Sequence, residues 1–290
     1  MFGGFLSRRV QLSRPYLSPD ALSADPPAAD VYCTGSDQVW NSGTNGFVEG
    51  PFYLDFAPPG KPRIAFSASF GRPRLPAEEM DEIRPRLRGY AGIGVRESSG
   101  VSVLKALGVR ECACTLDPTL ALPPDKWREL AARGEMPGLP QRYILVYQFN
   151  KDPLIDDIAD RLAAETGFKV VKIFFFRHGK PRQSQIKVLA PEVESFLWLV
   201  QHASFVVTNS FHALAFSSVF RKRFAAVYPK DYGVRLDDYL ELVGLKSRHF
   251  IPGESGLADV LSDIDYDRVD GILREKRTET LAYVEKMLRA

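Results

Sequence analysis

The chain has 290 residues, of which 45% are hydrophobic and 26% charged, and its net charge is +2. A single hydrophobic core rarely grows beyond about 250 residues, so this length predicts two domains. The composition excludes a largely disordered chain. The balanced charge excludes the one-sided basic surface that is typical of nucleic-acid-binding proteins, so we expect no nucleic-acid partner.

No window of the sequence approaches the roughly 18 uninterrupted apolar residues that a membrane-spanning helix needs. At the start of the chain, a short apolar patch precedes the arginines Arg8 and Arg9. This order is the reverse of that in a secretory signal peptide. We therefore expect a cytoplasmic protein with at most peripheral membrane association.

The first half of the chain predicts a parallel α/β domain over residues 1–120, with an irregular lead-in at 1–30. Short apolar runs alternate with helical stretches, which is typical of βαβ units. The expected strands lie at 31–34, 64–68 and 93–95, and the expected helices at 77–88 and 99–107.

A proline-rich stretch at 121–142 predicts a linker, and a second parallel-sheet domain is expected over 143–290. Its strands are expected at 143–148, 169–175 and 205–208, and its helices at 153–166, 191–202 and 211–221. A long charged helix at 266–289 is expected to pack back across the first domain.

The first candidate site follows the apolar run 205–208. Asn209 and Ser210 are good N-caps for a helix that starts near Phe211. His212 would then lie in the first helical turn, at the carboxyl end of a parallel strand, where open α/β sheets bind ligands and backbone N–H groups favour anions. The alternative is a core histidine whose hydrogen bonds are satisfied.

The second candidate is Arg96, which follows the apolar strand 92–95. An arginine at a strand's carboxyl end can make bidentate contacts to a phosphate or carboxylate. The alternative is a salt bridge to Glu97 or to another acid.

The third candidate is the turn after the strand 31–34. Gly35 and Ser36 leave room for a ligand to approach, and Asp37 places a carboxylate beside it. The alternative is a capped tight turn without a ligand.

Several other functions are excluded by missing patterns. The glycine spacing does not match G-x-G-x-x-G, and neither a P-loop nor a G-x-S-x-G motif occurs, so no dinucleotide, P-loop or serine hydrolase site is expected. The C-x-C pair at Cys112 and Cys114 is a poor zinc pattern, and no metal is expected. We interpret the run Phe174–Phe176 as a buried strand in preference to an aromatic stacking surface.

Taken together, the ordered motifs resemble the polysaccharide pyruvyltransferase family over roughly residues 31–250. The segments that carry the resemblance are GSDQVWN at 35–41, IAFSASFG at 64–71, VRESSGVSVLKALG at 95–108, LDPTL at 116–120, TNSFHALAFSSVF at 208–220 and RLDDYLELVGL at 235–245.

The resemblance implies two Rossmann-like parallel-sheet domains that face a cleft in a glycosyltransferase-B-like arrangement, with the active site in that cleft. It implies phosphoenolpyruvate as the donor substrate, with no cofactor. The acceptor would be a sugar or a lipid-linked oligosaccharide, and the product a pyruvate ketal on a cell-surface polysaccharide or its precursor. In the family, the histidine matching His212 is the favoured general acid, and the arginine matching Arg96 is a candidate for binding the donor's anionic groups.

Two departures from the family pattern affect these expectations. Many members carry an arginine where this chain has Ser210, so part of the expected anion clamp is either missing or supplied from elsewhere, with Arg235 as the candidate. Members usually begin with a further strand and an Asn-Tyr-Gly loop, so a truncated N-terminal domain is expected. Asp37 or Asp117 could orient or deprotonate the acceptor hydroxyl, although a capping role explains either carboxylate equally well.

Two alternative functions remain open from the sequence. One is a nucleotide-sugar-dependent glycosyltransferase of the same architecture, because a fold does not fix a function. The other is a catalytically weak binding protein that retains the fold, which the short N-terminus and Ser210 motivate.

Overall fold

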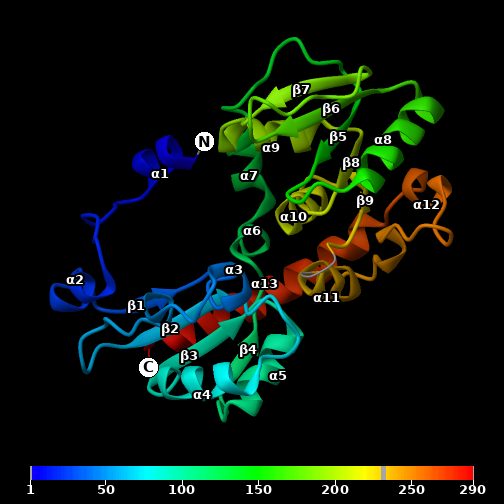
Figure 1. Ribbon diagram of the computed structural model, residues 1–290. Helices are drawn as coiled ribbons and strands as arrows, with labels where there is room; N and C mark the ends of the chain where they lie inside the picture. Colours follow the sequence, from blue (N-terminus) through cyan, green and yellow to red (C-terminus); the bar gives the residue numbers. More distant parts are fainter. Residues whose placement is uncertain (1, 230–232, 290) are drawn as a thin grey trace. The chain divides into compact units, whose positions relative to one another are not determined.

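The computed structural model describes residues 2–229 and 233–289, which form two compact α/β units (Figure 1). The N-terminal unit consists of Ser13–Ala121 and Leu273–Ala290, and the C-terminal unit of Met1–Leu12 and Leu122–Ile272. Each unit contains one sheet in which every strand pair is parallel. The expected class of two Rossmann-like parallel-sheet domains is therefore confirmed.

The sheet of the N-terminal unit has the strand order β1-β2-β3-β4. Its strands are β1 (Tyr32–Thr34), β2 (Arg63–Ala68), β3 (Tyr90–Val95) and β4 (Cys112–Cys114). Its helical segments are α2 (Pro19–Ala24), α3 (Ser42–Asn45), η1 (Gly50–Tyr53), α4 (Ala77–Arg86), α5 (Ser98–Ala106) and α6 (Pro118–Ala121).

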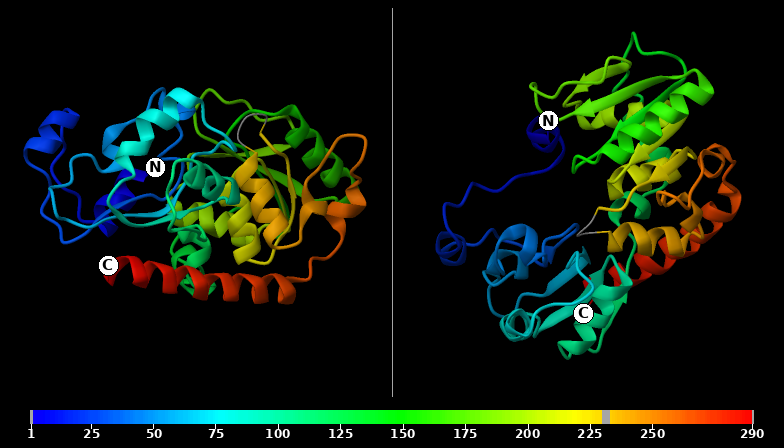
Figure 2. Two further views of the ribbon diagram at one scale, coloured as in Figure 1. Left: turned by 90° about the horizontal axis from the view of Figure 1, so that it is seen from below. Right: turned by 45° about the vertical axis from the view of Figure 1, so that its right-hand side comes forward.

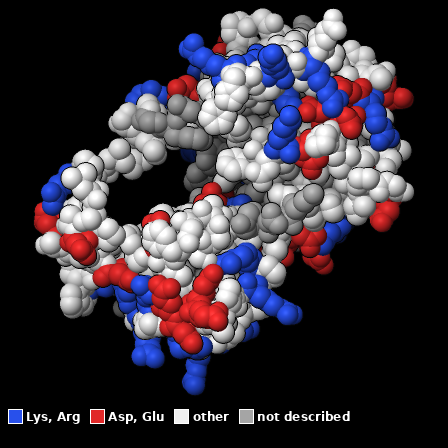
Figure 3. Space-filling view, in the orientation of Figure 1, with Lys and Arg blue, Asp and Glu red and all other residues white. Residues whose placement is uncertain are grey.

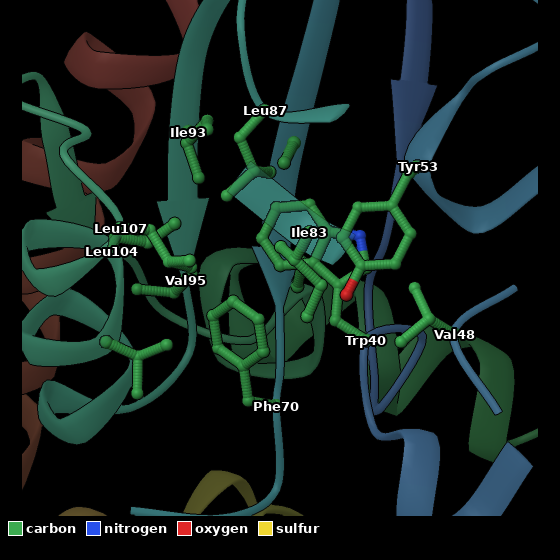
Figure 4. Close-up of a cluster of buried hydrophobic side chains, with 13 residues drawn as sticks. Trp40, Val48, Tyr53, Phe70, Ile83, Leu87, Ile93, Val95, Leu104 and Leu107 are labelled. Atoms are coloured by element: carbon green, nitrogen blue, oxygen red, sulfur yellow. The ribbon is translucent and has the colours of Figure 1, made fainter. Parts of the chain in front are cut away.

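The core of this unit is built around aromatic side chains (Figure 4). The Trp40 ring stacks on Tyr53 with a centroid distance of 5.3 Å and lies 5.2 Å from the Phe70 ring. The Trp40 indole N–H donates to the carbonyl of Phe52 at 2.9 Å, so its one polar group is satisfied. This packing fixes the segment that follows β1.

Strand β3 divides its side chains between the two faces of the sheet, because successive residues of a strand point to opposite sides. Ile93 and Val95 belong to the aromatic core together with residues of α4 and α5. Gly92 faces the other way, and a Cβ there would lie 2.4 Å from Cγ of Met287. The missing side chain therefore lets the C-terminal helix approach the sheet closely.

That helix is α13 (Tyr266–Arg289), which starts in the C-terminal unit and ends in the N-terminal one. In the N-terminal unit, Thr280 Oγ1 accepts a hydrogen bond from the backbone N–H of Leu116, and the Tyr283 hydroxyl donates to the carbonyl of Ile93. The views of Figures 1 and 2 agree in showing its last turns beside this sheet.

The sheet of the C-terminal unit has the strand order β7-β6-β5-β8-β9. Its strands are β5 (Tyr143–Tyr147), β6 (Lys169–Phe174), β7 (Gln185–Leu189), β8 (Phe205–Thr208) and β9 (Arg223–Ala226). Its remaining helical segments are α1 (Phe2–Arg9), α7 (Pro124–Ala131), α8 (Pro153–Thr166), α9 (Val193–His202), α10 (Phe211–Val219), α11 (Val234–Leu242), η2 (Lys246–Arg248) and α12 (Leu257–Leu261).

Helix α8 shows how local sequence sets these boundaries. The Asp152 side chain accepts from the backbone N–H of Leu154, Pro153 occupies the first helical position, and Gly167 ends the helix in the left-handed conformation. Its apolar face, which includes Ile155 and Leu162, packs in a buried cluster with residues of β5, β6, β8 and β9.

The expectation of an irregular lead-in at residues 1–30 is wrong at two places. Residues 2–9 form α1, which belongs to the C-terminal unit, where Arg8 and Arg9 lie 3.8 and 3.7 Å from the Glu194 carboxylate. Residues 19–24 form α2, where the Ser18 side chain accepts from the N–H of Ala21. A serine cap followed by proline is a helix start that the low apolar content concealed.

Neither unit has a face of one charge in the view of Figure 3, where basic and acidic side chains are interspersed. Among the residues that the structure describes, no helix is long and apolar enough to cross a membrane.

Candidate functional site

The carboxyl edge of the N-terminal sheet gathers charged side chains from three strands. Arg96 follows β3, Ser36 and Asp37 follow β1, and Asp117 lies three residues beyond β4. The Arg96 guanidinium is 2.5 Å from the Asp117 carboxylate and 3.3 Å from that of Asp37. It also donates to the Ser36 hydroxyl at 2.7 Å. Four of the candidate residues therefore meet in one cluster.

Burial differs sharply within this cluster. The side chains of Arg96 and Asp117 are 2% and 1% exposed, whereas that of Asp37 is 52% exposed. A second Asp117 oxygen accepts from the backbone N–H of Thr119 at 2.8 Å, which caps α6. Arg96 thus makes the ion pair that was the alternative to a phosphate contact. Asp37 is the member of the cluster whose carboxylate reaches the surface.

Gly35 is required by the close approach of β1 to β2. Its φ is +106°, and a Cβ there would lie 2.2 Å from the carbonyl oxygen of Phe66. The following turn places Asp37 at a φ of 77°, and its carbonyl accepts from the N–H of Ser69 at 2.9 Å. A main-chain bridge therefore holds the Asp37 backbone against the end of β2.

Glu97 is a contributor to this edge that the sequence analysis treated only as a partner for Arg96. It is fully buried, and one carboxylate oxygen accepts from the Ser69 hydroxyl and from the backbone N–H groups of Phe70 and Gly71, at 3.0 to 3.3 Å. Glu97 therefore fixes the loop after β2. An acid two residues after the end of an apolar strand was the available signal.

At the carboxyl edge of the C-terminal sheet, the residues after β8 form a hydrogen-bonded junction. Thr208 Oγ1 donates to the carbonyl of Tyr147 at 2.6 Å and accepts from the N–H of Ser210 at 3.0 Å. The Asn209 amide accepts from the N–H of Phe149 at 2.9 Å and donates to the carbonyl of Asn150 at 2.7 Å. Asn209 therefore joins the loop after β5 to the end of β8.

Ser210 and His212 lie where the sequence placed them. Ser210 is the N-cap of α10, and its hydroxyl accepts from the N–H of Ala213 at 3.5 Å. His212 is in the first turn and half-buried, whereas its neighbours Phe211 and Ala213 are buried. The imidazole is consequently not a fully buried core side chain.

Arg235 lies close to this junction. Its guanidinium carbon is 5.8 Å from the centroid of the Phe211 ring, and the rings of Phe211 and His212 are 5.7 Å apart in an edge-to-face arrangement. Arg235, in the first turn of α11, thus lies beside the helix that carries His212. An arginine and a histidine therefore flank the Phe211 ring in the same unit.

A third group of titratable side chains surrounds the end of β9. The Tyr228 ring stacks on His249 with a centroid distance of 3.4 Å, and the Tyr228 hydroxyl donates to Asp237 at 2.9 Å. Asp237 also accepts from Lys246. Burial raises the pKa of Tyr228 and lowers the pKa of His249. The sequence analysis did not select this group.

The predicted residues thus form two groups, one at the carboxyl edge of each sheet. The first group is Gly35, Ser36, Asp37 and Arg96, and the second is Asn209, Ser210, His212 and Arg235. Among the described residues, no group of three or more His, Cys, Asp or Glu side chains could hold a metal ion.

With the exception of Arg235, the residues of both groups fall inside one stretch of sequence similarity. Residues 4–231 match the family model described as polysaccharide pyruvyl transferase. The chain belongs to the polysaccharide pyruvyl transferase family. Since the match covers most of the chain, the resemblance read from the ordered motifs is confirmed. Membership in this family indicates a transferase that acts on polysaccharide. No curated protein matches the chain.

One solved structure shows the same architecture at low sequence identity. The chain is similar to a protein of Listeria monocytogenes described as a UDP-N-acetylglucosamine 2-epimerase, with a TM-score of 0.55 and 12% identity over 93% of this chain and 75% of that one. It is also similar to the glycotransferase of kitacinnamycin, with a TM-score of 0.47 and 14% identity over 93% and 78% of the two chains. At such identities the first likeness shows only the glycosyltransferase-B-like fold.

Proposed function

We propose that this pyruvyl transferase moves the pyruvyl group of phosphoenolpyruvate to two hydroxyls of a sugar and so forms a pyruvate ketal on a polysaccharide or its precursor. The observation that carries the proposal is the half-buried His212 in the first turn of α10, at the carboxyl end of β8. Ligands of parallel α/β sheets bind at this edge, and helix N-termini favour anions.

The reaction needs an acid, because the donor is an enol phosphate. Proton transfer from the His212 imidazolium to the methylene carbon leaves an oxocarbenium-like centre at the adjacent carbon. An acceptor hydroxyl oxygen attacks this centre and loses its proton. The second hydroxyl then displaces inorganic phosphate and closes the ketal, and its proton leaves with the phosphate. Histidine suits the acid, since its ordinary pKa lies near neutrality.

The donor's negative charge requires a fixed cation, and we assign that role to Arg235. Its guanidinium lies over the ring next to His212, and Ser210 stands where many family members carry an arginine. Asn209 and Ser210 hold the loop and the helix start in place through their hydrogen bonds. A planar guanidinium can grip a carboxylate or phosphate with two parallel hydrogen bonds.

We assign the base to Asp37, and to Arg96 the role of positioning it. Asp37 is the exposed carboxylate of its cluster, and Arg96 is almost fully buried between Asp37 and Asp117. In this assignment Gly35 and Ser36 shape the turn that carries Asp37, and Ser36 is a further hydrogen-bonding partner of Arg96.

The proposal is tested by incubating the purified protein with phosphoenolpyruvate and candidate acceptor glycans. Release of inorganic phosphate that depends on the acceptor, together with a new ketal methyl signal in the proton NMR spectrum of the product, is the expected result. Phosphoenolpyruvate should also raise the melting temperature, since a ligand at 100 times its Kd stabilises by about 2.7 kcal/mol. Stabilisation by a UDP-sugar but not by phosphoenolpyruvate would contradict the proposal and favour a nucleotide-sugar-dependent glycosyltransferase. No response to either donor would favour a binding protein.

A further inference from the structure

Exposed aromatic side chains lie beyond the ends of two adjacent strands of the C-terminal sheet. Phe149, after β5, is 76% exposed, and Phe176, after β6, is 67% exposed. Phe175 connects the two loops, since its ring is 6.2 Å from that of Phe149. The Phe176 ring stacks almost parallel on His178 at 5.5 Å and 11°. The interpretation of Phe174–Phe176 as a buried strand is therefore wrong beyond Phe174, where β6 ends.

The loop after β6 is held in this shape by its own contacts. Lys187 Nζ donates to the carbonyl of Arg177 at 2.7 Å and to that of Gly179 at 2.5 Å. Gly179 lies against the Phe174 ring, where a Cβ would be 2.4 Å from Cδ1. The loop that follows Phe176 is thus held in place by Lys187 on β7 and by the packing of Gly179 against Phe174 on β6.

The surface continues directly from the edge that carries His212. Strands β6, β5 and β8 are neighbours in the sheet, and adjacent strands lie about 4.8 Å apart. The backbone N–H of Phe149 donates to the Asn209 side chain, three residues before His212. The loops after β5 and β6 therefore continue the edge that carries His212 from strand to strand. The spacing between neighbouring strands, about 4.8 Å, is comparable to the width of a sugar ring.

The chemistry of the surface fits an acidic glycan. Large apolar side chains that stay in water usually mark a binding site when they are contiguous. The face of an aromatic ring carries partial negative charge and attracts the C–H groups of a pyranose. Arg177, His178 and Lys180 are exposed in the same loop and would attract carboxylate or phosphate groups.

We propose that Phe149, Phe175 and Phe176, with Arg177 and Lys180, form a subsite for sugar rings of an acidic acceptor glycan other than the ring that is modified. This subsite rests on the proposed function, because it gives the acceptor chain its place beside His212. It predicts a preference for extended, negatively charged acceptors over single sugars.

Native gel electrophoresis in gels that contain soluble polysaccharide tests the subsite without donor or turnover. Alginate and hyaluronan are the acidic probes, and dextran is the neutral one. We expect both acidic probes to retard the wild-type protein. The double variant Phe149→Ala/Phe176→Ala should bind them at least about tenfold more weakly, since two aromatic contacts are lost. Arg177→Gln/Lys180→Gln should weaken binding of the acidic probes only.

Phe47→Ala is the matched control, because Phe47 is 64% exposed and belongs to the N-terminal unit. It should be retarded like the wild type. Phe149→Leu/Phe176→Leu keeps apolar side chains without rings and should resemble the alanine variant, even if the alanine variant is less stable.

Three results would overturn the subsite. These are the absence of retardation by both acidic probes, equal retardation of wild type and aromatic variants, and aromatic-dependent binding to phosphatidylglycerol vesicles without binding to any glycan, which would indicate a membrane surface. Retardation together with no phosphate release from phosphoenolpyruvate would keep the subsite and reject the proposed reaction. Phosphate release with no retardation would reject the subsite and keep the proposed reaction.

Discussion

The carboxyl edges of the two sheets differ in how their polar side chains are used. In the N-terminal unit, the Arg96 guanidinium and the Asp117 carboxylate are buried against each other, whereas the Asp37 carboxylate is exposed. In the C-terminal unit, the polar residues after β8 are uncharged groups whose hydrogen bonds to the backbone fix the start of the helix that carries the half-buried His212.

The carboxyl edge of a parallel sheet can therefore do one of two things, which are to fix its own loops or to present side chains to a ligand. A charge that is already paired and buried holds loops in a fixed geometry, but it is not available to a ligand. An imidazole at a helix start, with exposed aromatic rings on the neighbouring loops, remains accessible. We therefore expect substitutions of the buried pair Arg96 and Asp117 at the first edge to change mainly stability, and substitutions at the second edge to change mainly turnover.

The largest effect is expected from Arg96→Met. The variant leaves the Asp117 carboxylate, 1% exposed, without its ion-pair partner. Breaking one side of a buried pair lowers the free energy of unfolding by about 3–5 kcal/mol. Urea denaturation followed by circular dichroism measures this loss.

Arg128→Met is the control, because that arginine is 44% exposed and pairs with Asp125 on the surface. It should change the unfolding free energy by less than about 1 kcal/mol. If Arg96→Met unfolds like the wild type but needs far more phosphoenolpyruvate for turnover, Arg96 is a donor ligand and the contrast between the edges is wrong.

Gly35→Ala should be the next most damaging change. The left-handed φ costs an alanine about 1–2 kcal/mol, and the Cβ, 2.2 Å from the Phe66 carbonyl oxygen, adds about 1–3 kcal/mol of overpacking. Gly46→Ala is the matched control for the steric contribution, since Gly46 has a φ of +90° but nothing within 4 Å of the added Cβ. Thermal denaturation should show a clearly smaller loss for Gly46→Ala, and equal losses would show that the approach of β1 to β2 is not tight.

His212→Ala should leave stability nearly unchanged and lower kcat by about 100-fold or more, because general acid catalysis contributes about 10²- to 10⁴-fold. His212→Gln keeps a hydrogen-bond donor but has no proton to transfer near neutral pH, so it should be almost as inactive. Phosphate release gives kcat, and the melting temperature gives the stability.

His202→Ala provides the comparison, because that histidine is exposed at the end of α9 and stacks on Trp198. It should retain wild-type turnover. Both His212 variants could instead show a large fall in melting temperature and lose activity only in proportion to unfolded protein. His212 would then be a structural residue, and the two edges would no longer differ in their effects on stability and turnover.

The smallest effect concerns pH. Burial lowers the pKa of His249, whose surroundings include Asp237, Lys246 and Glu254. The folded state therefore takes up a proton less readily than the unfolded state, whose histidine has a pKa near 6.5. Stability should fall by no more than about 1 kcal/mol as the pH drops below about 6.5 through the lowered pKa. His249→Gln should reduce the fall in melting temperature between pH 7.5 and pH 5.0. An unchanged pH dependence would show that other groups cause this fall.

Much of the regular structure could be predicted because local patterns determine it. The buried run of β5, the capped helix α8 and the Ser210 cap of α10 all follow from residues within a few positions of one another. The missed strands are β4, β7 and β9. All three lie at sheet edges and have short or mixed polar sequences, so only their strand partners identify them.

The sequence by itself determined the two parallel sheets, the family and the place of His212 at the start of α10, because each depends on periodicity, capping or an ordered set of motifs. Only the tertiary structure decided that Arg96 pairs with Asp117 and that Phe176 stays exposed. Ser36 and Asp117 meet across 81 positions of the chain. Contacts of this kind depend on strand order and loop path, which bring distant residues together and which no local pattern encodes.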